Sequence, residues 1–327
     1  MEQPVLAEFD NQRPPSPQFP LALQKTALSL ITNPSTSLPT LSSLLKTLTL
    51  HLQGPTHHHR GILSLLSALS DHHPNLRSEI SLAVRAFALL PSTPTSSLAH
   101  SLSVLFKVAD FSNDVADESV FLSLCFRPCK ASLRRWLLRN VDKFRVRPSV
   151  SITVLLGFTK DPFPLTRKAA LDGLVWLCKF IAVEDQSLVQ CCYFRATELL
   201  FEADDSVRCS AVRAVSVWGQ LLVESNRDKC KIDWSDTLFV QLCSLVRDMS
   251  MKVRIEAFDA LAKVGIVSED VLLQTLTKKA TSATKEKIFL GQYTAKVYKL
   301  PASAVAFAIV HGLEDEFFER HIAGKVV

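Results

Sequence analysis

The chain has 327 residues, of which 47% are hydrophobic and 21% are charged, and its formal net charge at pH 7 is +5. This composition can fill a packed core, while the charge is too mild for the strongly basic face of a nucleic-acid-binding domain. Eight cysteines do not make the dense framework of a disulfide-rich secreted protein, and no apolar run is long enough to predict a membrane span.

The chain begins with a proline-rich stretch, residues 1–20, that has no helical period of apolar residues. We expect a disordered or loosely docked leader there. Residues 21–110 are rich in leucine, serine and threonine, and prolines divide them into stretches of helical length. We expect irregular N-terminal helical repeats in this region, with helices near residues 21–32, 38–53, 57–70, 75–90 and 96–109.

Histidines in this region raise the alternative of a metal site, because imidazole is a common metal ligand. They occur as His57, His58 and His59, and as His72 and His73. Since no cysteine or carboxylate accompanies them at ligand spacing, we interpret them as residues of a polar helix start and a turn.

A basic cluster follows an acidic stretch between residues 111 and 147. It is either a solvated helix face beside an acidic neighbour, or an anion site for a phosphate-bearing ligand or an acidic partner, because arginine forks suit phosphate and carboxylate. Arg135, Arg139 and Lys143 follow at steps of four, so we expect them to line one helical edge. The candidate anion-binding or partner-binding residues are Lys130, Arg134, Arg135, Arg139, Lys143, Arg145 and Arg147.

The clearest regularity lies in residues 111–265, which we expect to form HEAT or armadillo repeats. Its clearest unit is DMSMKVRIEAFDALAKVG, whose apolar residues at steps of three are expected to form the buried face: Ile255, Phe258, Leu261 and Val264. Two short amphipathic helices joined by a tight turn need neighbours of the same kind to bury their apolar faces. The sequence therefore predicts an all-α fold, a HEAT/armadillo-type helical-repeat solenoid.

An acidic residue six positions before an arginine marks the start of several of these helices, and we interpret these pairs as a structural ladder. A carboxylate near a helix N-terminus is favoured by the unpaired N–H groups and the helix dipole. The arginine lies one helical turn further on, where its side chain can reach the acidic residue of the next repeat and so link the two repeats. The alternative is that the arginines bind an acidic ligand. The ladder residues are Asp71, Arg77, Asp161, Arg167, Glu202, Arg208, Asp248 and Arg254.

Residues 266–327 depart from this pattern. The polar and basic stretch 279–300 indicates an insertion loop within a repeat, and loops of this kind often carry function. The segment 303–327 holds one apolar helix and ends shortly after Arg320. We expect a truncated last repeat there that is only partly docked, because a short helix rarely holds without packing.

The sequence contains no catalytic motif: a Gly-rich phosphate loop, GxSxG and HExxH are all missing from it. Cys178, Cys209 and Cys243 lie on apolar stripes, where a free cysteine behaves as a small buried hydrophobe. We therefore expect a binding protein rather than an enzyme, without catalytic residues, cofactor or metal.

Four segments carry a family resemblance: GFTKDPFPLTRKAALDGLVWLCK, FEADDSVRCSAVRAVSVWGQLL, DMSMKVRIEAFDALAKVG and AFAIVHGLEDEFFE. They resemble the Integrator complex subunit 4 family, in particular its plant, SHORT-ROOT-interacting branch, and the resemblance covers roughly residues 115–319. Family members continue beyond EDEFFE with more repeats, whereas this sequence turns to HIAGKVV, so we expect a C-terminally truncated or alternative product.

The resemblance implies a scaffold in a nuclear complex whose endonuclease subunits cleave the 3′ ends of small nuclear and other nascent RNAs. It implies other Integrator subunits, the nuclease pair above all, as partners, and it makes inositol polyphosphate a candidate ligand; no sequence-specific nucleic-acid binding is expected. The plant branch adds an alternative, an adaptor that binds transcription factors and promotes their intracellular or intercellular movement. The expected location is the nucleus, with the cytoplasm or endosome as further places for the adaptor.

Overall fold

The computed structural model describes residues 21–54, 56–108, 115–127, 130–144, 146–180, 186–225, 228–277 and 308–313. These residues form helices joined by turns, and strands are absent from them. The chain divides into two compact units, Met1–Arg147 and Pro148–Val327, each described here by itself. The expected leader 1–20 and insertion 279–300 lie outside the described residues.

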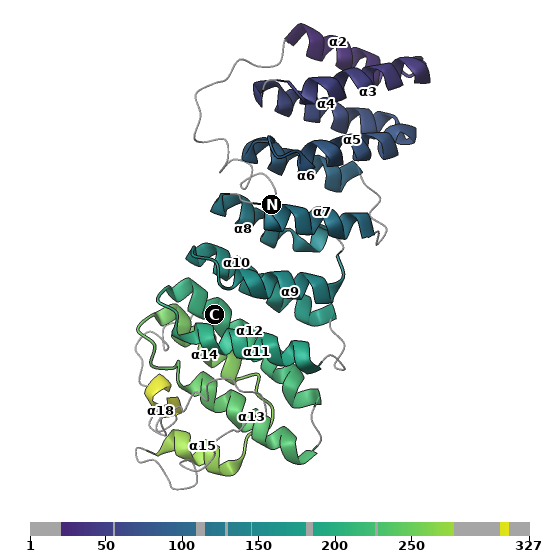
Figure 1. Ribbon diagram of the computed structural model, residues 1–327. Helices are drawn as coiled ribbons and strands as arrows, with labels where there is room; N and C mark the ends of the chain where they lie inside the picture. The colour runs from purple at the N-terminus through teal and green to yellow at the C-terminus, as the bar shows by residue number, and fades with distance from the viewer. Residues whose placement is uncertain are drawn as a thin grey trace, which may run out of the picture. The chain divides into compact units, whose positions relative to one another are not determined.

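The first unit stacks helices in two rows (Figure 1). One row contains α2 (Leu21–Thr32), α4 (His59–His72), α6 (Thr95–Val108) and α8 (Ala131–Arg139). The other row contains α3 (Leu38–Leu52), α5 (Arg77–Leu89) and α7 (Val115–Phe126). Short 3₁₀ segments precede or follow these helices: η1 (Thr56–His58), η2 (Pro74–Leu76) and η3 (Val141–Phe144).

Prolines and the leucine period explain where these helices form. Pro39 occupies the first turn of α3, where its missing N–H costs nothing, and Pro74 opens η2. The buried side chains of α3 recur at steps of three and four, as Leu41, Leu45, Leu48 and Leu52. The helices expected in residues 21–110 begin and end within two residues of those observed.

In the second unit, each helix pair packs internally and the second helices of successive pairs pack on one another. The pairs are α9 (Pro148–Phe158) with α10 (Pro164–Leu177), α11 (Gln186–Glu198) with α12 (Asp205–Ser225), and α13 (Asp228–Cys243) with α14 (Met251–Leu261). The 3₁₀ segments η4 (Cys178–Phe180) and η5 (Leu199–Phe201) extend α10 and α11. The helix α15 (Glu269–Leu276) packs on α18 (Ala308–Leu313), the part of the expected last repeat that is described.

The centre of the second unit is α12, which contacts α10, α11, α13 and α14. Its Trp218 is fully buried, and Gly219 lets it approach its neighbours closely. A Cβ at Gly219 would lie 2.6 Å from Cδ1 of Leu238 and 3.1 Å from Cε2 of Tyr193, so a larger residue would require these side chains or α12 to shift. Helix pairs stacked in this way confirm the predicted all-α helical-repeat solenoid.

The buried face of α14 differs from the expected one. The buried residues are Val253, Ala257, Ala260 and Leu261, whereas Ile255, Phe258 and Val264 are only half-buried. The reason is that the buried residues recur at i, i+4, i+7 and i+8, which keeps them on one side of the helix, whereas residues at steps of three move by about 60° around the helix axis at each step. Among the described helices, none is both long and apolar enough to cross a membrane.

Candidate interaction site: the arginine ladder

Each helix pair of the second unit is joined by a short turn that contains an acidic residue. In the first and third turns the carboxylate closes the turn locally: Asp161 Oδ1 accepts the N–H of Phe163 at 2.9 Å, and Asp248 Oδ1 accepts the N–H of Ser250 at 2.8 Å. In the second turn Asp204 does this, because its Oδ1 accepts the N–H of Ser206 at 2.9 Å. A carboxylate in this position satisfies N–H groups that the following helix leaves unpaired.

The arginine six residues after Asp161, Glu202 or Asp248 donates back into the same turn. Its Nη1 reaches two carbonyl oxygens that the preceding helix leaves without partners. Arg208 Nη1 donates to the carbonyls of Glu202 at 2.7 Å and Ala203 at 2.9 Å. The equivalent distances are 2.8 and 3.1 Å from Arg167 to Asp161 and Pro162, and 2.9 and 3.4 Å from Arg254 to Asp248 and Met249.

The same guanidinium groups then reach the acid of the next turn. Arg208 donates from Nε to Asp248 Oδ2 and from Nη2 to Asp248 Oδ1, both at 2.8 Å. Arg167 Nε lies 2.9 Å from Glu202 Oε2 as an ion pair, although its N–H is not aligned for a hydrogen bond. The paired side chains are largely buried, with 10–20% of their surface exposed. The hydrogen bonds to Asp248 raise the pKa of Arg208.

A second charged network runs beside the ladder along α10, α12 and α14. Arg213 of α12 lies 3.5 Å from Asp172 of α10 through Nη1 and 3.0 Å from Glu256 of α14 through Nε. Asp172 also accepts from Lys168 at 2.6 Å and from the hydroxyl of Ser210 at 2.7 Å. The sequence interpretation missed this network; its only signal was that Asp172 and Arg213 each lie five residues after a ladder arginine.

Two further polar links join successive helix pairs. Arg195 of α11 donates to Thr159, from Nε to Oγ1 at 2.7 Å and from Nη2 to the carbonyl at 2.9 Å. Asp236, buried in α13, accepts from the N–H of Ser268 at 2.8 Å and from its hydroxyl at 2.6 Å. The second unit is therefore held by side chains that bridge repeats as well as by apolar packing.

Asp71 and Arg77 do not share the ladder geometry. They lie where α4 passes into η2 and α5, and Asp71 pairs with Lys107 of α6 at 2.6 Å. Arg77 donates from Nε to the carbonyl of Ser70 at 3.3 Å. The six-residue spacing therefore recurs here in the connection from α4 to α5. In the second unit, by contrast, it lies in the turn between the two helices of a pair.

The residues of the basic cluster are spread over α8, η3 and the ends of both. Helix α8 ends at Arg139 and its cap, Asn140, donates from Nδ2 to the carbonyl of Trp136 at 2.8 Å, so Lys143 is not on the same helical edge as Arg135 and Arg139. Lys143 Nζ lies 5.9 Å from the ring centroid of Phe106.

The described residues of the cluster have different environments. Arg147 forms two hydrogen bonds to Glu118, at 2.9 and 2.7 Å, which lower the pKa of that carboxyl. Lys130 and Arg139 are exposed, and Arg134 and Arg135 are half-buried. Arg145 lies outside the described residues. The structure thus leaves a basic surface along α8 and ties Arg147 to an acid of α7.

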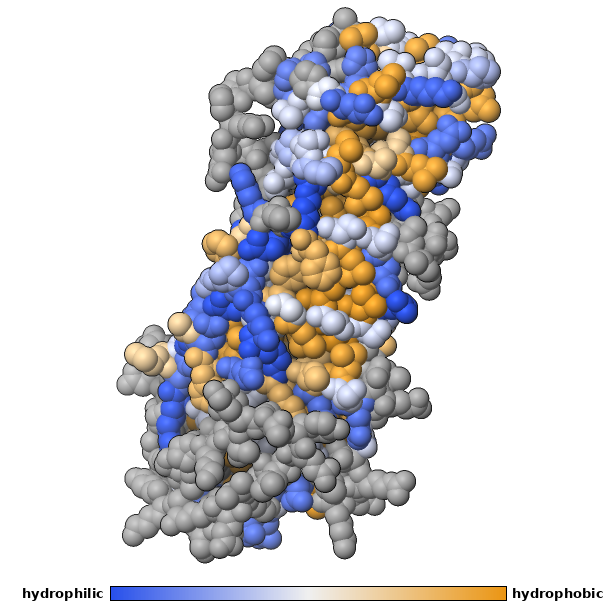
Figure 2. Space-filling view, viewed as in Figure 1, coloured by the Kyte–Doolittle hydropathy of each residue, from blue (hydrophilic) through white to orange (hydrophobic). Residues whose placement is uncertain are grey.

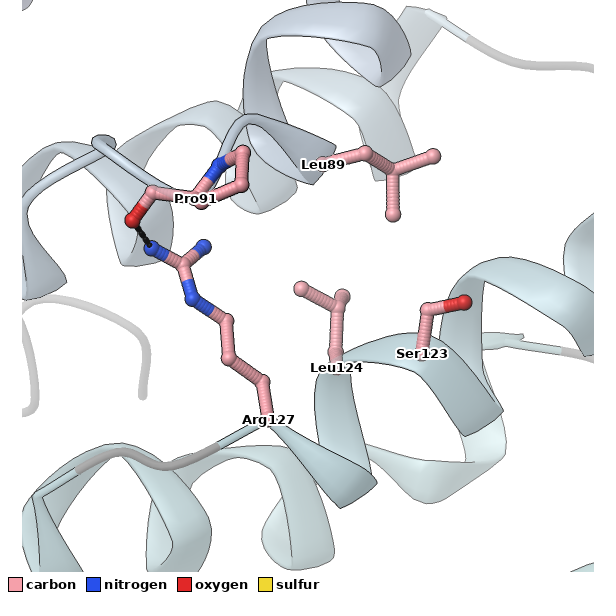
Figure 3. Close-up of a pocket in the computed structure, with 5 residues that line it drawn as sticks. All are labelled: Leu89, Pro91, Ser123, Leu124 and Arg127. Carbon is pink, nitrogen blue, oxygen red and sulfur yellow. Dashed lines mark hydrogen bonds between the residues drawn. The ribbon is translucent and has the colours of Figure 1, made fainter.

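A small cavity lies between the ends of α5 and α7 (Figure 3). Leu89, Pro91, Ser123, Leu124 and Arg127 line it, and its volume is about 200 Å³. Arg127 donates from Nη2 to the carbonyl of Pro91 and to that of Thr93, the latter at 3.2 Å.

Three cysteines of the second unit, Cys178, Cys209 and Cys243, lie where their thiols stay protonated. Burial raises the pKa of Cys178 to about 11 and that of Cys243 to about 12, and it raises the pKa of Cys209 as well. These groups are therefore poor nucleophiles at neutral pH. Within the described residues, histidine, cysteine and carboxylate side chains do not gather in threes that could hold a metal ion.

Comparison with known proteins finds relatives of one kind, Protein SIEL and Integrator complex subunit 4. No protein-family model matches the chain. Protein SIEL of Arabidopsis thaliana is 40% identical over 308 residues, which are 89% of this chain and 32% of SIEL. Integrator complex subunit 4 of Homo sapiens is 29% identical over 222 residues, 59% of this chain and 22% of that protein, and its Drosophila melanogaster counterpart is 27% identical over 160 residues, 40% and 16%.

These similarities confirm the resemblance to the Integrator complex subunit 4 family and to its plant branch. The chain spans about a third or less of the length of the curated relatives it matches.

Proposed function

From its similarity to Protein SIEL and to Integrator complex subunit 4, we propose that this chain is a non-catalytic scaffold that acts by protein–protein interaction within the Integrator complex. In this role it supports 3′-end processing of small nuclear RNA and nascent transcripts by subunits other than itself. Its partners are other Integrator subunits, the nuclease pair among them, and its location is the nucleus.

The observation that carries this proposal is the extent of the similarity, which covers 89% of the chain at 40% identity with SIEL. The physical character of the second unit supports it. Arg167 and Arg208 fasten successive helix pairs through largely buried contacts, and such a stack presents a long surface to partners.

A second candidate is an adaptor that binds transcription factors and promotes their movement within or between cells. The higher identity with SIEL than with Integrator complex subunit 4 favours it, since SIEL represents the plant branch to which that role was assigned above.

One experiment separates the two candidates: affinity purification of the endogenous tagged protein from nuclear and cytoplasmic fractions, with mass spectrometry. We expect Integrator subunits, nucleases included, to co-purify from nuclei at a stoichiometry that a tagged, unrelated helical-repeat protein does not reach. Transcription factors and trafficking components in place of these subunits would favour the adaptor, and the scaffold proposal would then be wrong.

A further inference from the structure

The cavity between the ends of α5 and α7 combines apolar walls with a hydrogen-bond donor that has no acceptor. Leu89, Pro91 and Leu124 supply the apolar part of its lining. Arg127 also lines the cavity, and its buried Nη1 has no hydrogen-bond partner within the described part of the chain. In Figure 3 Nη1 lies on the cavity side of the guanidinium, whereas Nη2 donates to the carbonyl of Pro91. Because a buried donor without an acceptor is costly, an acceptor that enters the cavity would be stabilising.

Large apolar side chains lie on and beside the cavity lining. The exposed fraction is 40% for the lining residue Leu89, and it is 38% and 77% for the sequence neighbours Leu90 and Phe126. In the area of Figure 2 that α5 occupies in Figure 1, hydrophobic surface is open to solvent. The cavity volume is about 200 Å³, and an apolar cavity of about 150 Å³ is known to bind benzene. The cavity therefore suits an aromatic ring.

The cavity lies at the edge of the first unit where α3, α5 and α7 end and α4, α6 and α8 begin, which we call the cavity edge. The described lysines and arginines close to this edge include Arg60, Arg85, Arg127 and Lys130. The described acids of the unit lie at the opposite edge, where α4 and α8 end or α5 and α7 begin: Asp71, Glu79, Asp117, Glu118 and Asp142. An occupant of the cavity therefore gains from carrying negative charge.

The leader, residues 1–20, joins the described helices at this same edge. Residues 33–37 join α2 to α3, and short connections of this kind make consecutive helices antiparallel, so α2 begins on the same side as α4 and α6. Since α2 packs on α4 and α4 on α6, at about 8–10 Å for each packed pair, the cavity lies about 20–30 Å from Leu21. Phe9 precedes Leu21 by 12 residues, which span about 40 Å when extended. The leader is therefore long enough to bring Phe9 to the cavity.

We propose that residues 5–10 of the leader, VLAEFD, bind in this cavity of their own chain, with the ring of Phe9 between Leu89 and Leu124. Glu8 and Asp10 flank Phe9, so either can bring a carboxylate to Arg127 Nη1. The segment contains these two acids and no basic residue, which complements the cavity edge. Covalent linkage raises its effective concentration at the cavity to the order of millimolar. The inference does not depend on the proposed scaffold function.

The test is photocross-linking of the full chain with p-benzoylphenylalanine in place of Phe9, followed by mass spectrometry of the linked peptides. We expect links within one chain to the cavity-lining segments 89–93 and 123–127. The matched control carries the same probe in place of Phe19, the other phenylalanine of the leader. Because Phe19 lies within about 7 Å of the start of α2, its links to these segments should be at least about tenfold weaker.

Charge variants test the contact with Arg127. Glu8→Gln together with Asp10→Asn should lower the yield of cavity links at least about fivefold, because the guanidinium loses its charged acceptor. Glu2→Gln, which removes an acid further from Phe9, should leave the yield within about twofold of the wild type.

Arg127→Gln should lower the yield as the double change in the leader does. Because it also removes the hydrogen bonds to the carbonyls of Pro91 and Thr93, the melting temperature of this variant is measured as well. The changes in the leader keep these hydrogen bonds, so they decide the outcome if Arg127→Gln unfolds the first unit.

Three results would overturn the proposal. One is a probe at position 9 that links elsewhere in the chain, only to another protein, or not at all. Another is a yield of cavity links that the loss of both acids leaves unchanged. The third is linking between isotopically light and heavy copies in a mixture, since the occupant would then be a second copy of the chain.

Discussion

Arg208 holds Asp248 through two hydrogen bonds of 2.8 Å across a separation of 40 residues, while its Nη1 caps the carbonyls of Glu202 and Ala203 in its own turn. One planar guanidinium group thus donates hydrogen bonds to acceptors in two neighbouring turns. Lysine, with a single ammonium group, cannot reproduce this fork.

Replacing Arg208 should therefore be costly. Arg208→Ala removes the arginine hydrogen bonds of Asp248 and of two carbonyls in a site where 14% of the arginine side chain and 10% of the aspartate side chain are exposed. We expect a loss of about 2–4 kcal/mol in the free energy of unfolding, measured by urea denaturation. Arg139→Ala, on an exposed position of α8, should cost less than about 0.5 kcal/mol. Similar losses for the two variants would contradict the assignment.

The second charged network should behave differently, because it is more exposed. Arg213 has 42% of its side chain exposed and Glu256 has 24%. We expect Arg213→Ala to cost at most about 1 kcal/mol, and that cost should shrink at high salt, where exposed charges are screened. The cost of Arg208→Ala should change little under the same conditions. A salt dependence of the same size for both variants would speak against this distinction.

The first unit should lose stability in mild acid through His59. This buried residue hydrogen-bonds to Ser97 through Nδ1 at 3.0 Å and to the Gly54 carbonyl through Nε2 at 3.2 Å. Burial lowers its pKa below 6.5, so the unfolded chain takes up a proton before the folded one does. Its stabilising contribution is therefore complete above pH 6.5 and is lost as the pH falls through the folded pKa.

The measurement is the urea midpoint as a function of pH. His59→Gln should lower the midpoint at neutral pH and flatten its fall between neutral and mildly acidic pH. His72→Gln, at an exposed position, serves as the control and should leave the slope of the wild type unchanged. A wild-type slope that survives in the His59→Gln variant would show that other groups cause it.

The helix pattern was predictable because it depends on local signals. Prolines and apolar steps of three and four placed the helices of residues 21–110, and the acid–arginine spacing singled out the three ladder turns. Asp71 and Arg77 show the limit of that spacing. Their partners, Lys107 and the carbonyl of Ser70, depend on which connection of the repeat they occupy, and a six-residue count does not report that.

Other features could not be read from the chain because they arise from packing between distant elements. The contacts of Arg213 with Asp172 and Glu256 join three helices through charges that look like ordinary surface residues in sequence. The buried face of α14 was misjudged because alanines such as Ala257 belong to it, while the larger Phe258 is only half-buried. The end of α8 at Arg139 separates Lys143 from a step of four that looked continuous.

The basic surface of α8 stays a prediction. If it binds a phosphate-rich ligand, changing Arg135, Arg139 and Lys143 together to alanine should abolish the binding of inositol hexakisphosphate in calorimetry without lowering the melting temperature. The control removes the same charge elsewhere, by Lys160→Ala, Arg247→Ala and Lys252→Ala, and should bind as the wild type does. Binding that survives the α8 changes would leave this surface as a solvated helix face.

The central claim, that ladder pairs fasten successive repeats of the solenoid, is tested most directly by a double-mutant cycle on Arg208 and Asp248. The free energy of unfolding is measured for the wild type, for Arg208→Ala, for Asp248→Ala and for the double variant. Because the two side chains contact each other directly, the account predicts a favourable coupling energy of about 1–3 kcal/mol. Single-variant costs that add to the double-variant cost within about 0.5 kcal/mol would contradict it.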